Sequence, residues 1–125
     1  MKYVVLIHSH PEPWAHPTIE HTEEGQALPA EKRRNMDTDF DALLAELSAS
    51  GEFVSAEALA EPRVAKIARW GSGGPLVTDG PFAETKEQLA GFFVIDCATR
   101  ERAEELARRF AAPGDTIELR PTMSD

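Results

Sequence analysis

The sequence contains one cysteine, no long apolar run and no surplus of basic residues. A lone cysteine excludes an internal disulfide, which agrees with a reducing compartment, and the apolar strand pattern around Cys97 predicts an inert, buried thiol. The longest apolar run, residues 3–7, is far shorter than the roughly 20 residues of a membrane span, and no signal-peptide pattern follows Lys2. We therefore expect a cytoplasmic protein that does not bind membranes.

The excess of acidic residues argues against nucleic-acid binding. The formal net charge of -9 repels phosphate backbones unless a local basic patch outweighs it. The candidate patches, residues 32–34 and 108–109, are short and flanked by acids. A chain of 125 residues is large enough for one hydrophobic core, so we expect a single domain over residues 1–125.

Hydrophobic periodicity predicts an α+β fold. Two amphipathic helices are expected, one over residues 30–50 and one that starts at Thr99 and ends before Pro113. The strands are expected at residues 3–7, 53–59, 63–70, 75–78, 91–97 and 116–120. This order predicts a ferredoxin-like βαββ(β)αβ antiparallel sheet with two helices on one face, in which the first strand is central and buried on both faces. The second face would carry too much apolar surface for a monomer, so we expect a homodimer that forms an α+β barrel.

A proline-rich insert with no regular pattern is expected at residues 8–29, and it contains every histidine of the chain. Loops of this length often bind ligands or act as lids. One hypothesis is a metal site; the alternative is a polar insert whose histidines merely titrate near neutral pH, since the spacing matches no standard zinc motif. The candidate metal ligands are His8, His10 and His16, with Glu12, Glu20 or Glu23 completing the shell.

Residues 78–92, TDGPFAETKEQLAGF, resemble the signature of the DGPF branch of the YCII-related family. Residues 1–3, 49–52, 58–60 and 117–121 also resemble members of that family. The resemblance implies a ferredoxin-like fold and a dimeric α+β barrel, but no assigned reaction. Some members occur beside extracytoplasmic-function sigma factors, which implies a non-catalytic accessory or sensing module as an alternative function.

The resemblance also makes Asp79 the first candidate for chemistry. YCII-like barrels resemble small-molecule isomerases and dehalogenases that use an acid/base residue, and Asp79 matches the motif position expected to face the pocket. Independently of the resemblance, His8 directly follows the central strand, where a pocket mouth is expected, and is the candidate base partner of Asp79. The alternative is a purely structural turn, in which Gly80 takes a positive φ, Pro81 fixes the exit and Phe82 plugs the core; in the functional interpretation these three residues contact the ligand.

Other side chains are candidates for holding a ligand. Lys86 could bind an anionic substrate, although a solvated surface lysine is equally compatible with the pattern. Trp14 could stack on a ligand or anchor the insert to the body. Asp37 and Asp39 are of interest only if they lie near the barrel mouth. Because no phosphate-binding loop or dinucleotide fingerprint is present, no organic cofactor is implied, and the leading hypothesis is a small-molecule-binding dimer with isomerase-, lyase- or hydrolase-like acid/base chemistry.

Overall fold

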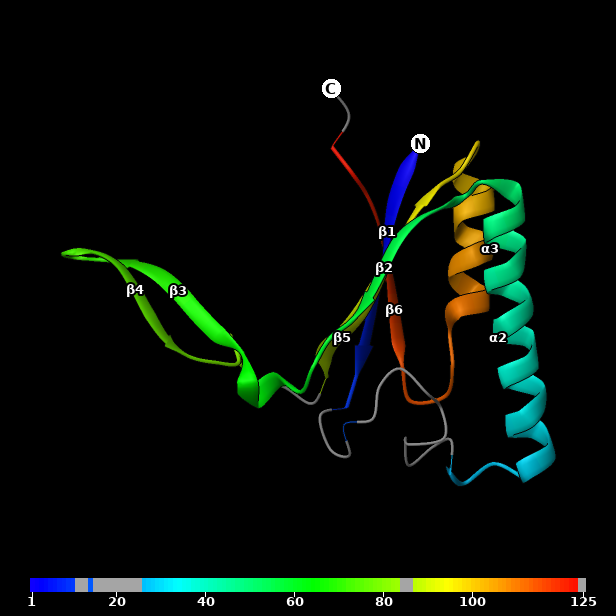
Figure 1. The fold of residues 1–125 in the computed structure, drawn as a ribbon, viewed down its shortest axis with the longest axis horizontal. Coiled ribbons are helices and arrows are strands. Elements are labelled where there is room, and N and C mark those ends of the chain that lie inside the picture. The colour runs from blue at the N-terminus through cyan, green and yellow to red at the C-terminus, as the bar shows by residue number, and fades with distance from the viewer. Residues whose placement is uncertain (11–13, 15–25, 84–86, 124–125) are drawn as a thin grey trace.

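The computed structural model describes residues 1–10, 14, 26–83 and 87–123. Figure 1 shows a sheet with two helices beside it and a hairpin that extends away from both. The elements are, in chain order, β1 (Lys2–Ser9), α2 (Ala30–Ser50), β2 (Phe53–Ala58), the 3₁₀ helix η2 (Pro62–Val64), β3 (Lys66–Gly71), β4 (Gly74–Asp79), β5 (Gln88–Asp96), α3 (Arg100–Phe110) and β6 (Thr116–Pro121).

The main sheet has the ferredoxin-like order β2-β5-β1-β6. All its neighbouring strands are antiparallel, and β1 lies between β5 and β6. Both helices cover the same face of this sheet (Figure 1). The predicted α+β fold and the central position of the first strand are therefore confirmed.

The helix ends follow local sequence signals. Helix α2 stops at Gly51, which has φ 79° and takes the left-handed conformation that glycine adopts without steric cost. Helix α3 starts at Thr99, whose hydroxyl accepts a hydrogen bond of 3.1 Å from the backbone N–H of Arg102. Both helices match the predicted residue ranges.

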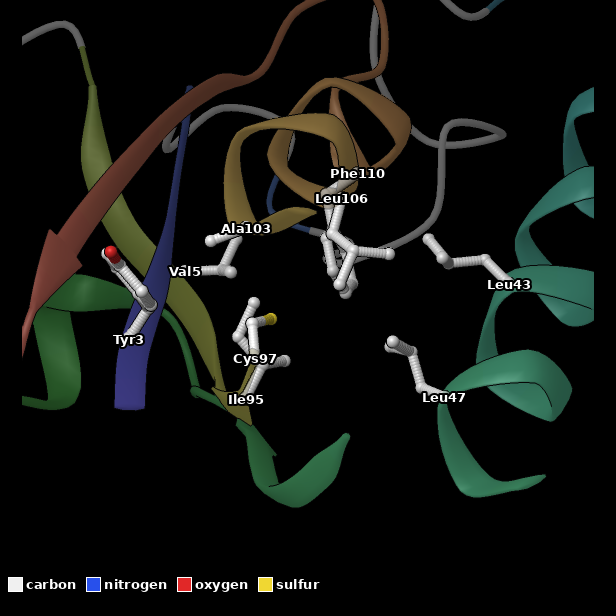
Figure 2. Packing of buried hydrophobic residues seen from close by; sticks show 9 residues of the cluster. All are labelled: Tyr3, Val5, Leu43, Leu47, Ile95, Cys97, Ala103, Leu106 and Phe110. Carbon is white, nitrogen blue, oxygen red and sulfur yellow. The ribbon is translucent and has the colours of Figure 1, made fainter. Parts of the chain in front are cut away.

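The core lies between the helices and the covered face of the sheet, as Figure 2 shows. The thiol of Cys97 is buried, as predicted, and this burial raises its pKa. Because the interior is closely packed, each buried side chain of this core is held by contacts from several elements. The buried cluster consists of Tyr3, Val5, Leu43, Leu47, Ile95, Cys97, Ala103, Leu106 and Phe110.

An ion-pair network joins both helices to the start of β2. The guanidinium of Arg102 donates to both carboxylate oxygens of Glu52 at 2.9 Å and to Glu46 at 2.6 Å. Arg109 donates to the same Glu46 oxygen at 2.8 Å. The hydrogen bonds from Arg109 and Arg102 lower the pKa of Glu46 to about 2, so this carboxylate remains charged well below neutral pH.

The second face of the sheet is not covered by a helix among the described residues (Figure 1). Along β1 the odd-numbered residues are buried, whereas Val4 and Leu6 are only half-buried. Their neighbours on β5, Phe92 and Val94, are half-buried as well. The prediction that the first strand is buried on both faces is therefore wrong for a single chain, in which only one face of β1 is fully buried.

Strands β3 and β4 form a separate two-stranded sheet, which we call the arm (residues 66–79). The predicted strand over residues 63–70 starts too early, because Pro62 opens the 3₁₀ helix η2 and its carbonyl accepts the N–H of Ala65 at 2.9 Å. Proline suits that first position because its missing N–H has no partner to lose there. Within the described helices, none is long and apolar enough to cross a membrane.

Candidate functional site

A cleft of about 210 Å³ opens between α2 and the C-terminal end of α3, near the end of β1. Met36 and Phe40 are four residues apart on α2, so they project from one face of the helix. Phe40 packs edge-on against Phe110 with ring centroids 6.2 Å apart. Together with Ile7 of β1, these side chains give the cleft an apolar lining.

Among the described residues, the charged lining of the same cleft is predominantly acidic. Asp37, Asp39 and Asp115 contribute three carboxylates, and Arg109 contributes one guanidinium. Arg109 is already bound to Glu46, which offsets its positive charge locally. The cleft therefore combines apolar side chains with a mainly negative charged lining, a combination suited to a small molecule that carries a positive charge.

His8 lies on the uncovered face of the sheet, opposite the cleft side. Its Nε2 is 3.2 Å from Oε1 of Glu118 on the neighbouring strand β6. Hydrogen bonds from Arg120, and secondly from His8, lower the pKa of Glu118. This contact with the Glu118 carboxylate fixes the position of the His8 imidazole on the sheet. The predicted insert starts too early at residue 8, since residues 8 and 9 belong to β1.

Asp79 ends β4 at the base of the arm and pairs with Lys66 across the hairpin. Its side chain is 83% exposed, and among the described residues Asp79 belongs neither to the lining of the cleft nor to the buried cluster. Among the described residues no hydrogen bond or ion pair joins Asp79 to His8. Acid/base chemistry by these two residues stays a prediction.

The turn after Asp79 differs from the predicted one. Gly80 does not have a positive φ; it is needed because a Cβ there would lie 2.9 Å from the Cβ of Ala65. Its N–H donates to the carbonyl of Ala65 at 2.7 Å, and its peptide bond to Pro81 is cis. Phe82 does not plug the core: it is 73% exposed, with the guanidinium of Arg69 5.1 Å from its ring centroid.

The remaining predicted ligand-binding residues are described only in part. The indole N–H of Trp14 donates to the carbonyl of Leu59 at 3.2 Å, which favours the anchoring interpretation. Lys86 and His16 lie outside the described residues. In the part of the chain that the structure describes, no three His, Cys, Asp or Glu side chains are grouped as metal ligands, so a metal site that includes His16 stays a prediction.

The comparison with known families agrees with this fold. The model of the YCII-related domain matches residues 1–121, almost the entire chain. The chain belongs to the YCII-related family. It is also 40% identical over 70 residues to "Uncharacterized protein R00369" of Rhizobium meliloti (strain 1021). That match covers 56% of this chain and 56% of the relative, so it supports kinship without indicating an activity.

The sequence of this YCII-related chain did not predict the cleft itself. Asp37 and Asp39 were of interest only if they lay near the barrel mouth; both line the cleft, and their place in a dimeric barrel stays a prediction. Arg109 and Asp115 were not identified as site residues. Arg109 lies in the last turn of α3. A basic residue there is already explained by its favourable interaction with the helix dipole. The sequence around Arg109 therefore gave no separate indication of a cleft.

Proposed function

We propose that this YCII-related protein binds a small organic cation in the cleft between α2 and α3, and that it does so as a homodimer. The observation that carries the binding proposal is that apolar side chains and three carboxylates line the same cleft. A buried apolar surface supplies affinity, and a few charged groups select the ligand. Repulsion from these carboxylates disfavours organic anions.

The size of the cleft limits the ligand to about one ring. An apolar cavity of about 150 Å³ is large enough for benzene, and the cleft here has about 210 Å³. An aromatic or cyclic group could pack against Phe40 and Phe110, while an amine projects to Asp37. Phenethylamine has this architecture, and 3-phenylpropionate has a similar apolar body with a negative charge instead.

The test compares these two probes by thermal unfolding. We expect phenethylamine to raise the melting temperature in a saturable manner, because it binds only the folded state, and 3-phenylpropionate to leave it unchanged. Asp37→Asn should weaken the effect of the amine. Asp41→Asn is the matched control, because Asp41 is exposed on the same helix but does not line the cleft. Equal stabilisation by both probes, or equal loss in both variants, would refute the proposed site.

The homodimer proposal rests on the uncovered face of the main sheet. Val4, Leu6, Phe92 and Val94 alternate with the core residues of β1 and β5, so they share this face. A contiguous apolar strip of this kind in a protein of 125 residues is typical of a subunit interface. Association of two such faces would remove both strips from water.

Sedimentation equilibrium tests this interface with two variants of one strand. Val94→Asn places an amide in the apolar strip and should shift the protein from dimer to monomer. Asp96→Asn is the control. It places the same asparagine side chain on the same face of β5, two residues after Val94, at a position that is already polar, and it should leave the dimer intact. A wild-type protein that is monomeric at every concentration would contradict the proposal.

A further inference from the structure

The arm exposes large apolar side chains far from the core. Trp70 is 83% exposed, Val77 70% and Leu76 57%. Figure 1 shows that the arm extends away from the main sheet and from both helices. An isolated two-stranded hairpin is only marginally stable in water. With these apolar side chains exposed, the arm of a single chain therefore lacks packing contacts that would stabilise it.

The register of the arm assigns its side chains to two faces. Trp70 is opposite Pro75, and Ala68 is opposite Val77; since side chains alternate along a strand, these four lie on one face. We call them the Trp70 face. Apart from the Lys66–Asp79 ion pair at its base, this face is formed by apolar groups.

The other face of the arm has partners within its own chain. The guanidinium of Arg69 lies over the ring of Phe82, and the side chain of Leu76 lies against Gly71. The Trp70 face is therefore the more available of the two for a contact with another molecule.

Charge identifies a partner that complements the arm. Residues 62–82 contain three basic residues and only one acidic residue, Asp79. The rest of the chain carries ten of the 13 basic residues and 21 of the 22 acidic ones. A second copy of this chain thus offers a strongly acidic body to a basic arm, which favours their encounter.

From these observations we propose that the arm packs through its Trp70 face onto a second copy of the chain. A two-fold dimer uses each arm once, so two Trp70 side chains enter the interface. Burial of about 200 Å² for each indole would supply about 400 Å² of a standard interface of about 1,600 Å². The inference rests on the homodimer proposed above and adds the arm to its interface.

The fluorescence of Trp70 reports directly on this contact. In a Trp14→Phe background Trp70 is the only tryptophan. We expect the dimer to show blue-shifted emission and quenching by acrylamide several-fold weaker than in the Val94→Asn monomer. Sedimentation on the same samples measures the oligomeric state independently of the arm.

A pair of neighbouring substitutions separates the two faces of the arm. Val77→Asp puts a carboxylate on the Trp70 face and should weaken the dimer and expose Trp70. Thr78→Asp makes the same change on the opposite face of the same strand and should do neither. Both positions are exposed in one chain, so neither variant should unfold it.

Each outcome has one meaning. A dimer in which Trp70 remains fully quenchable would overturn the arm contact but keep the homodimer. Shielding of Trp70 in the Val94→Asn monomer would show that the arm folds onto its own chain, which also overturns the proposal. A wild-type monomer would overturn both proposals, while the phenethylamine test of the cleft would remain independent.

Discussion

Replacement of Leu47 by alanine should remove a large part of the stability of the fold. Leu47 has an exposed fraction of 0% and packs in the core between α2 and the sheet (Figure 2). The substitution deletes three buried carbon atoms. At about 0.8 kcal/mol for each carbon, it removes about 2.4 kcal/mol of hydrophobic stabilisation. The cavity left behind adds to this, so we expect a loss of about 3 kcal/mol in the free energy of unfolding.

Urea unfolding followed by far-UV circular dichroism measures this loss, at one fixed protein concentration because dimer formation makes stability concentration-dependent. Leu44→Ala is the matched control, since Leu44 is half-buried on the same helix; it should cost about 1 kcal/mol, because less apolar surface is returned to water. Equal losses in the two variants, or a loss below about 1 kcal/mol for Leu47→Ala, would refute the assigned packing of α2.

Three further predictions concern the ion-pair network, the arm and the start of α3. The pKa of Glu46 is lowered from 4.5 to about 2, so its stabilisation is complete above pH 4.5 and is lost as the pH falls towards 2; Glu46→Gln should flatten this part of an acid-unfolding curve. Gly80→Ala brings a Cβ to 2.9 Å from that of Ala65 and should speed amide hydrogen exchange in the arm, whereas Gly73→Ala, with nothing within 4 Å, should not. Thr99→Ala removes the cap of α3 and should cost about 1 kcal/mol in urea unfolding; an unchanged midpoint would contradict the assigned cap.

Local patterns were sufficient where one element carries its own signal. The apolar stripe that includes Leu43 and Leu47, ended by Gly51, predicts α2 as it occurs, and Thr99 predicts the start of α3. Periodicity and capping act over a few residues, so they can be read without knowledge of the partner surface.

The turn at the base of the arm shows where such patterns fail. Asp79-Gly80-Pro81 resembles a turn that needs a positive φ, yet Gly80 is required by the approach of Ala65, fifteen residues earlier. Phe82 resembles a core residue but is exposed just after the arm, where its ring lies under the guanidinium of Arg69. Both errors have the same origin, because the deciding neighbour is distant along the chain.

The sequence by itself determined the α+β class, the helix limits, the central first strand and the membership of the YCII-related family. Only the tertiary structure decided that the hairpin leaves the main sheet and that Asp37, Asp39, Asp115 and Arg109 share one cleft. The physical reason is that periodicity specifies which face of an element is apolar, whereas a cleft or an exposed arm depends on how separate elements pack against one another.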